Sequence, residues 1–332
     1  MSPPDEIRWA QIGCGEVTEK KSGPAFDKVP HSHRVGVFGR DAARTRDYAA
    51  RHGIAFAKTD VAALLAHPGV NAVYIATPPG SHLHFTRLAA AAGKAVYVEK
   101  PMARNVAECE EMIAVCRRAG VPLFVAYYRR ALPKYLRVKA LLDGGSVGRP
   151  LHVTVRYRCA PRPADLNPTT PPWRVQPEHA GPGGYFMDMA SHQLDLLDWL
   201  FGPVRHAAGA ARQTGAVYAA TDTVTGHFTL GGGVAGVGAW CFVTDPAAAC
   251  DETEIVGDAG ILRYSTFDDA PVRLTAGARS EKFAHPFPEH VQQPLIASVV
   301  AALRGEGICP STGDSALRTN RAVTALLGAM EV

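Results

Sequence analysis

The alternation of short apolar runs with segments of helical periodicity, from residue 7 to about 130, constrains the fold more than any other feature. Each run is bounded by turn residues and has the length of a buried strand. Repeated strand–helix units place their strands parallel in one sheet, with helices on both faces. The runs predict strands at residues 7–12, 34–39, 54–57, 71–77, 95–99 and 122–127.

The pattern changes after a helix predicted at 133–143, where the glycine-rich stretch 144–150 breaks the chain. The later apolar runs alternate with polar residues, which is typical of an antiparallel sheet with one solvated face. They predict strands at 151–159, 221–230, 233–243 and 252–265, and helices at 184–201 and 290–304.

We therefore expect two domains in an α/β protein. Six parallel strands complete a dinucleotide-binding domain, so residues 1–126 are predicted to form a doubly wound sheet of the Rossmann type. Residues 127–332 are predicted to form an α+β domain that binds the substrate and carries a large, mostly antiparallel open sheet.

Composition excludes several classes of protein. The chain has 35 basic and 31 acidic residues without a long run of either sign, so we expect no nucleic-acid partner. Met1–Glu6 lacks the features of a signal peptide and no apolar run reaches the length of a membrane span, so we expect a cytoplasmic protein with no membrane partner. The seven cysteines form no C-x-x-C pair and lie at no zinc-ligand spacing, which predicts reduced thiols and no metal site.

A glycine-rich turn follows the first predicted strand. Gly13 and Gly15 stand where a helix opens with Glu16 and Val17. In this context the first glycine allows a tight turn, and the second lets a pyrophosphate approach the backbone at the helix N-terminus. Thr18 occupies the place of the third glycine of that fingerprint. We interpret the turn as a dinucleotide site, with an ordinary glycine turn as the alternative.

The end of the second predicted strand determines the choice of dinucleotide. An acidic residue there binds the ribose 2′-hydroxyl of NAD, whereas an arginine accepts the 2′-phosphate of NADP. Arg40 stands at that place and Arg44 lies one helical turn further on, so the two could clamp the phosphate. We therefore favour NADP over NAD. In the alternative, Arg40 is a solvated surface charge, and Asp41 both caps the helix and binds the ribose.

Two further segments reach the carboxyl edge of the parallel sheet, where ligands bind in open α/β folds. Thr77 and Pro78 follow the fourth predicted strand, and His82 lies in the first turn of the next helix. The alternative for this segment is a rigid turn that ends in a helix cap. Lys100 follows the fifth strand, which directs it toward the nicotinamide, although an exposed lysine is usually only a solvated charge.

In the second domain, Asp188 and His192 lie four residues apart in the predicted helix 184–201. This spacing places both on one helix face, where a carboxylate can orient an imidazole and raise its basicity. A capping aspartate and a buried structural histidine are the alternative. Residues 161–182 carry seven prolines and no clear periodicity, which predicts a long irregular loop of the kind that shapes a binding site.

Together these motifs resemble the Gfo/Idh/MocA oxidoreductase family over nearly the whole chain. The resemblance rests on motifs in the family's order and spacing: Gly13-Cys14-Gly15, Thr77-Pro78-Pro79 with His82, Glu99-Lys100-Pro101, Tyr127-Tyr128-Arg129-Arg130 and Asp188-x-x-x-His192. It implies a Rossmann domain followed by a domain whose open sheet commonly mediates homodimers or homotetramers.

The resemblance also implies roles for individual residues. Lys100, Asp188 and His192 match the family's catalytic set, in which the lysine holds the reacting oxygen and often precedes a cis proline. Substrate or nicotinamide contacts are implied for Tyr128, Arg129, Trp173 and Arg174. The predicted cofactor-binding residues are then Gly13, Gly15, Glu16, Val17, Arg40, Arg44, Thr77, Pro78, His82, Glu99 and Lys100.

The expected reaction is reversible hydride transfer between NAD(P) and a carbinol or carbonyl carbon of a sugar, polyol or related cyclic alcohol. His192 is expected to act as general acid/base, Asp188 to orient it, and Lys100 to stabilise negative charge on the oxygen. Two other functions stay open. Some relatives are glycoside hydrolases that use bound NAD without net turnover, and a non-catalytic regulator would only sense NAD(P).

Overall fold

The computed structural model describes residues 3–328, which form two compact units. The first unit contains the chain up to residue 103 together with 107–132 and 288–316, and the second contains 104–106, 133–287 and the chain from 317. The segment 288–316 thus lies in the first unit, whereas the boundary expected from the sequence assigns it to the second domain.

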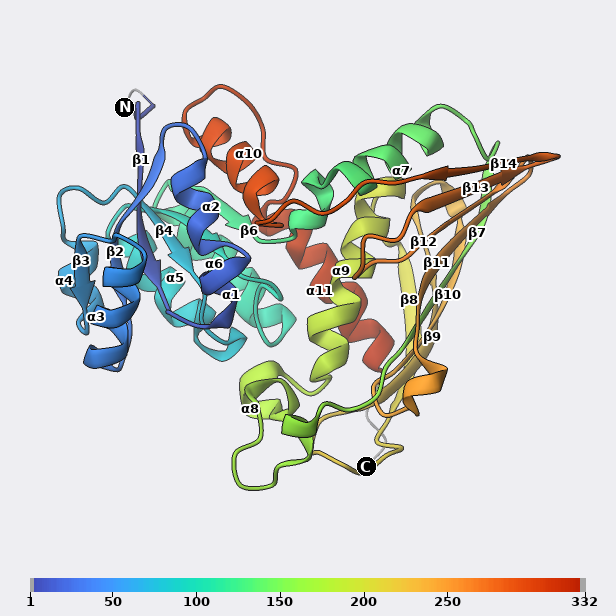
Figure 1. Cartoon of the computed structure of the whole chain (residues 1–332), viewed down its shortest axis with the longest axis horizontal. Coiled ribbons are helices and arrows are strands. Elements are labelled where there is room, and N and C mark those ends of the chain that lie inside the picture. Colours follow the sequence, from blue (N-terminus) through green and yellow to red (C-terminus); the bar gives the residue numbers. More distant parts are fainter. Residues whose placement is uncertain (1–2, 329–332) are drawn as a thin grey trace. The chain divides into compact units, whose positions relative to one another are not determined.

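The first unit is built on a six-stranded parallel sheet of order β3-β2-β1-β4-β5-β6 (Figure 1). All six predicted strands are present, with their ends shifted by at most two residues: β1 Ile7–Ile12, β2 Ser32–Phe38, β3 Phe56–Lys58, β4 Ala72–Ile75, β5 Ala95–Val98 and β6 Leu123–Val125. The strand order reverses between β1 and β4. This reversal opens a crevice at the carboxyl ends of the strands, so the doubly wound Rossmann sheet is confirmed.

Helices of the first unit connect and cover these strands: α1 Glu16–Lys20, α2 Gly23–Lys28, α3 Ala42–Arg51, α4 Val61–Leu65, α5 His82–Ala91, α6 Val106–Arg118 and α10 Gln293–Leu303. Asp41 caps α3 as predicted, because its carboxylate accepts a hydrogen bond from the backbone N–H of Arg44. On α6, Cys109 and Cys116 are buried in the core, and burial raises the pKa of Cys116 to about 12. Such a thiol stays protonated and unreactive.

The second unit contains an eight-stranded sheet of order β14-β13-β12-β11-β7-β10-β9-β8. Its strands are β7 Pro150–Arg158, β8 His206–Arg212, β9 Thr223–Thr229, β10 Ala235–Cys241, β11 Cys250–Gly257, β12 Ile261–Tyr264, β13 Val272–Ala276 and β14 Arg279–Phe283. Neighbouring strands are antiparallel except β7 and β10, which run parallel. The expected mostly antiparallel sheet is therefore confirmed.

Helices pack on one face of this sheet: α7 Pro133–Asp143, α9 Tyr185–Phe201 and α11 Gly313–Leu327 (Figure 1). The indole of Trp240 on β10 anchors α9, since its N–H donates a hydrogen bond of 2.7 Å to Gln193 and its ring packs against Phe186. Asp198 on α9 in turn forms an ion pair of 2.7 Å with Arg318 on α11. Helix α9 is thus fixed both by the sheet and by α11.

The structure corrects the sequence analysis in the later strands. The prediction of one strand over 252–265 is wrong, because the chain turns at Asp258-Ala259-Gly260 between β11 and β12. The turn is closed by a 2.8 Å hydrogen bond from the Gly257 N–H to the Gly260 carbonyl. Strands β8, β13 and β14 and helix α11 were not predicted. The proline-rich segment 161–182 is irregular as expected, with only short turns of helix at Pro163–Leu166, Trp173–Val175 and Pro177–Ala180.

Candidate active site

The glycine turn of the first unit joins three strand ends. Gly13 has a φ of +107°, and a Cβ at this position would lie 2.6 Å from the carbonyl oxygen of Ala76. Only glycine fits there, since both the conformation and the contact exclude a side chain. At Gly15 a Cβ would meet nothing within 4 Å, so the backbone faces open space. This cradle fits a dinucleotide pyrophosphate, which needs close approach to the main chain.

Thr18 replaces the third glycine of the fingerprint without leaving a gap. Its side chain is buried and its hydroxyl donates to the carbonyl of Gly15 at 2.8 Å. Its own carbonyl accepts a 2.9 Å hydrogen bond from the Tyr48 hydroxyl on α3. Beyond the turn, α1 begins with exposed Glu16 and half-buried Val17 and extends only to Lys20.

Cations gather at the end of β2. Arg40 follows this strand and is exposed. The guanidinium of Arg44 donates to the carbonyl of Cys14 at 3.1 Å, which holds it against the glycine turn. Lys58, which the sequence analysis did not single out, ends β3 and lies beside Phe38 in the sheet register. The register of the parallel strands is the signal that could have found it.

His82 connects the two other loops at this edge of the sheet. Its Nε2 lies 2.7 Å from the Thr77 carbonyl and its Nδ1 lies 3.1 Å from the Met102 carbonyl. The ring is fully buried, and burial lowers the pKa of His82 below its ordinary value. A neutral imidazole has one N–H, and the shorter distance favours donation to Thr77. His82 therefore lies between the turn after β4, to which it donates, and the loop that follows Lys100, whose peptide bond to Pro101 is cis.

A buried hydrogen-bond network surrounds Glu99. Its Oε1 accepts 2.6 Å hydrogen bonds from the Tyr74 hydroxyl and from the Gln292 side-chain amide. The Gln292 amide oxygen in turn accepts from the Tyr97 hydroxyl at 3.1 Å. Burial, reinforced by the charge of Glu99, raises the pKa of Tyr74 well above its ordinary value, so this phenol is a permanent donor. The network fixes the strand end that carries Lys100.

The segment before α10 also fastens the helix after the glycine turn. The Gln292 backbone N–H donates to the carbonyl of Lys21 at 3.3 Å, and the ring of His290 lies 2.7 Å from the carbonyl of Lys20. These contacts lie within the first unit. Gln292 is therefore part of the scaffold of the predicted cofactor site, although no local motif marks it.

Tyr128 and Arg129 follow β6 in a short 3₁₀ helix, Tyr128–Ala131. Both side chains are buried, and the guanidinium carbon of Arg129 lies 4.8 Å from the centre of the Tyr128 ring. They are placed at the same carboxyl edge as Thr77 and Lys100, because β6 runs parallel to β5.

Asp188 and His192 lie on the first turns of α9 and both are buried. The helix begins after Gly184, whose φ of +47° turns the proline-rich loop into it. Asp188 accepts a 2.9 Å hydrogen bond from the Nε of Arg174, with which it forms an ion pair. The ring of His192 packs against Phe267 at 5.9 Å between centres. The structure thus brings the predicted substrate residue Arg174 onto the predicted catalytic carboxylate.

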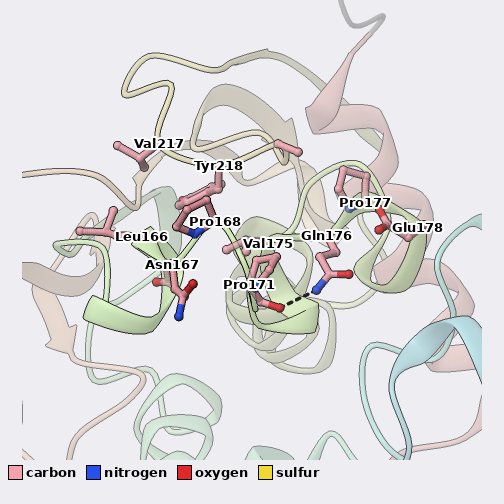
Figure 2. Close-up of a pocket in the computed structure, with 12 residues that line it drawn as sticks. Leu166, Asn167, Pro168, Pro171, Val175, Gln176, Pro177, Glu178, Val217 and Tyr218 are labelled. Atoms are coloured by element: carbon pink, nitrogen blue, oxygen red, sulfur yellow. Dashed lines mark hydrogen bonds between the residues drawn. The ribbon is translucent and has the colours of Figure 1, made fainter.

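The proline-rich segment forms a cavity of about 390 Å³ (Figure 2). The Gln176 amide donates to the Pro171 carbonyl at 2.5 Å and shapes one wall, while Val217 and Tyr218 come from another loop. Asp165 also lines it, is buried, and accepts a 2.8 Å hydrogen bond from the Tyr185 hydroxyl on α9. Trp173 stacks on the guanidinium of Arg174 at 4.4 Å and does not line this cavity.

Among residues 3–328, no group of three or more His, Cys, Asp or Glu side chains is arranged to hold a metal ion. Within the same part of the chain, no helix has the length and apolar character that crossing a bilayer requires.

Comparison with known proteins gives agreement over both units. Residues 7–127 match the model of the oxidoreductase family with an NAD-binding Rossmann fold, and residues 135–263 match the GFO/IDH/MocA C-terminal domain. The chain is 36% identical to Oxidoreductase P35 of Formosa agariphila, over 93% of this chain and 95% of that protein. It is 28% identical to a D-apiose dehydrogenase of Paraburkholderia graminis, over 94% of this chain and 84% of that protein.

A solved structure supports the same relation. The WlbA dehydrogenase of Bordetella pertussis, in complex with NADH and UDP-GlcNAcA, is 27% identical and superposes with a TM-score of 0.80 over 98% of this chain and 95% of that chain. Both halves of the sequence therefore agree with the fold, and the chain belongs to the GFO/IDH/MocA family of oxidoreductases with an NAD-binding Rossmann fold.

Proposed function

We propose that this oxidoreductase is a dehydrogenase or reductase that acts on a hydroxyl-bearing carbon of a sugar, polyol or related cyclic alcohol. The observation that carries the proposal is the buried pair of Asp188 and His192 on one face of α9, with Arg174 bound to the carboxylate. The D-apiose dehydrogenase among its relatives is named for a sugar substrate.

The residues of the first unit would hold NAD(P) at the carboxyl edge of the parallel sheet. Gly13 and Gly15 leave the backbone open to the pyrophosphate, and Lys100 follows the fixed strand end at Glu99. When bound, NAD(P) supplies a hydride acceptor or donor at the nicotinamide C4.

The chain itself supplies the proton transfer. His192 acts as general acid/base toward the substrate hydroxyl, since an imidazole exchanges protons in both directions near neutral pH. Asp188 keeps the imidazole oriented and stabilises its protonated form, and Arg174 holds the Asp188 carboxylate through their ion pair. The ammonium of Lys100 stabilises negative charge on the reacting oxygen.

The test is turnover with a panel of sugars and polyols, followed through the absorbance of the reduced nicotinamide. We expect reduced cofactor to accumulate with at least one cyclic sugar, and we expect this turnover to be lost in His192→Gln. Turnover that survives His192→Gln would contradict the assignment of the acid/base.

NADP is the proposed preferred cofactor. The exposed Arg40, the Arg44 guanidinium against the glycine turn and Lys58 at the end of β3 place three cations at this corner of the sheet. Asp41 is engaged as the α3 cap, which favours a phosphate over a ribose hydroxyl at this corner. Calorimetric titration should show tighter binding of NADP⁺ than NAD⁺, with about tenfold weaker NADP⁺ binding in Arg40→Ala. Equal binding of both cofactors, unchanged in Arg40→Ala, contradicts the preference.

A homodimer or homotetramer through the outer face of the second sheet is the proposed assembly. Along β10, Ala235, Val237 and Ala239 point outward while the residues between them are buried, and Val237 is 49% exposed. Ala208 and Ala210 on β8 lie on the same outer face, separated from the β10 residues by His227 and Thr225 of β9 in the sheet register. Light scattering should give a multiple of the 35.4 kDa chain mass, and Val237→Arg should give the monomer. A monomeric wild-type protein contradicts this assembly.

A further inference from the structure

The loop between β12 and β13 of the second unit is held by a buried lysine, a half-buried aspartate and a buried tyrosine. Lys134 on α7 has a side chain only 1% exposed, and its ammonium donates 2.9 Å hydrogen bonds to the Ser265 hydroxyl and to the Asp268 carbonyl. Burying an ammonium is costly unless it is paired and hydrogen-bonded. The buried lysine therefore fixes both ends of the short segment 265–268.

Two more side chains bind the centre of this loop. The carboxylate of Asp251 on β11 accepts hydrogen bonds from the backbone N–H groups of Thr266, at 2.8 Å, and Phe267, at 2.6 Å. The hydroxyl of Tyr135 on α7 donates to the Thr266 carbonyl at 2.7 Å. The backbone on both sides of the Phe267 α-carbon is consequently held in place.

The side chain that this loop presents is the ring of Phe267. It is half-buried and meets the His192 ring edge-on, at 5.9 Å between centres and an interplanar angle of 74°. It also packs against the ring of Tyr157 of β7, at 5.1 Å between centres and an interplanar angle of 73°. Edge-to-face contacts of this kind favour one orientation of a ring over others.

We propose that Phe267 is a positioning residue that holds the imidazole of His192 in the orientation needed for proton transfer. The proposal rests on the proposed function, in which His192 is the general acid/base. The orientation matters because a catalytic group loses rate when it leaves its productive geometry, and a rotamer is precise only when its neighbours are themselves fixed. Lys134, Asp251 and Tyr135 supply that fixed support.

The experiment compares Phe267→Leu, Phe267→Ala and Phe267→Tyr with a matched control, Phe283→Leu, which changes a half-buried phenylalanine on β14 of the same sheet. For each variant we would measure kcat, KM, the Kd of the cofactor, Tm and the solvent deuterium isotope effect. We expect kcat to fall about fivefold to tenfold in the Leu and Ala variants, the size expected when a side chain leaves its favoured rotamer. KM and the cofactor Kd should stay within about twofold, and the isotope effect should rise, because the altered step is proton transfer.

Phe267→Tyr should have a kcat within about twofold of the wild type, since it keeps the aromatic ring. Wild-type kcat in Phe267→Ala overturns the proposal. A fall in kcat that follows Tm and also occurs in Phe283→Leu overturns it too, because the effect would then be one of general stability.

A second readout separates this proposal from the proposed function. If His192→Gln retains wild-type turnover, the acid/base role of His192 fails, whatever Phe267 does. The contact itself is tested by NMR of the histidine ring protons in the whole protein without substrate. We expect one sharp His192 signal, shifted by the neighbouring ring, that broadens or divides in Phe267→Ala, and an unchanged signal overturns the positioning role.

Discussion

Glu99 in the first unit and Asp188 in the second are both buried carboxylates at sites of predicted function, but their partners differ in kind. Glu99 is bound by the neutral donors Tyr74 and Gln292, which belong to a strand and to the start of a helix. Asp188 is bound by the cation Arg174, which comes from the proline-rich loop and has a side chain 29% exposed.

The difference indicates a structural role for Glu99 and supports the proposed functional role for Asp188. Neutral donors on regular elements hold a carboxylate in place and leave no mobile partner. A cation on a partly exposed loop pairs with its carboxylate while remaining within reach of a ligand. We therefore expect changes around Glu99 to affect mainly stability, and changes around Asp188 to affect mainly activity.

The largest effect is expected at His192, the proposed general acid/base. His192→Gln removes the imidazole to which we assign proton transfer, so kcat should fall about 10²-fold to 10⁴-fold in steady-state assays. Binding of the cofactor, measured by calorimetry, should not change. His84→Gln, at an exposed position on α5, is the control and should leave kcat as in the wild type.

The next effect is expected at Gln292. Gln292→Leu deprives both the Glu99 carboxylate and the Tyr97 hydroxyl of a buried partner, which should lower the free energy of unfolding by about 1–3 kcal/mol. Denaturant unfolding measures this loss, and Gln293→Leu, at the half-buried next position, is the matched control. A Gln292→Leu protein of unchanged stability but strongly reduced kcat would break the comparison.

Arg174 should show the opposite balance. Arg174→Leu leaves the buried Asp188 without its ion pair to Arg174, and kcat should fall about tenfold. The loss of stability should be smaller than in Gln292→Leu, because Arg174 is partly exposed. Arg174→Lys keeps the positive charge but not the geometry of the guanidinium, so its kcat should lie between those of the wild type and Arg174→Leu. Equal kcat for all three proteins would show that Asp188 does not depend on this pair.

The smallest effect is expected at the surface of the first unit. Glu19 on α1 is bound by Arg51, the last residue of α3, and by His52, which follows it. The hydrogen bond from Arg51 lowers the pKa of Glu19 from 4.5 to about 2. Because this pKa is depressed in the folded state, the ionised Glu19 stabilises the fold at pH values above 4.5. That contribution is lost as the pH falls from 4.5 toward 2. The loss should be below about 1 kcal/mol, because the pair is largely solvated. Glu19→Gln should remove this part of the acid sensitivity in thermal unfolding, and an identical pH profile would contradict the assignment.

The parts that the sequence predicted are those dictated by chain order. Gly13, Thr77 and Lys100 each follow a strand of a parallel sheet, and the carboxyl ends of such strands meet at one edge whatever the loops do. The i to i+4 spacing of Asp188 and His192 likewise fixes a common helix face. These positions follow from backbone geometry alone.

The parts that the sequence did not predict depend on contacts between distant segments. Gln292 reaches Glu99 across 193 positions, and Phe267 reaches His192 from a loop between two short strands. Strand β8, His206–Arg212, has five alanines and glycines in its centre and lacks the β-branched and aromatic residues that indicate a strand. Its neighbours in the sheet, not its own sequence, make it extended.

The most direct test of the central claim, that His192 and Asp188 serve net hydride transfer, is the ratio of reduced cofactor formed to sugar oxidised by the purified protein. The account predicts one reduced nicotinamide for each product molecule, with both lost in His192→Gln. Product formed from a glycoside with no net change in the cofactor would contradict it and identify a hydrolase instead.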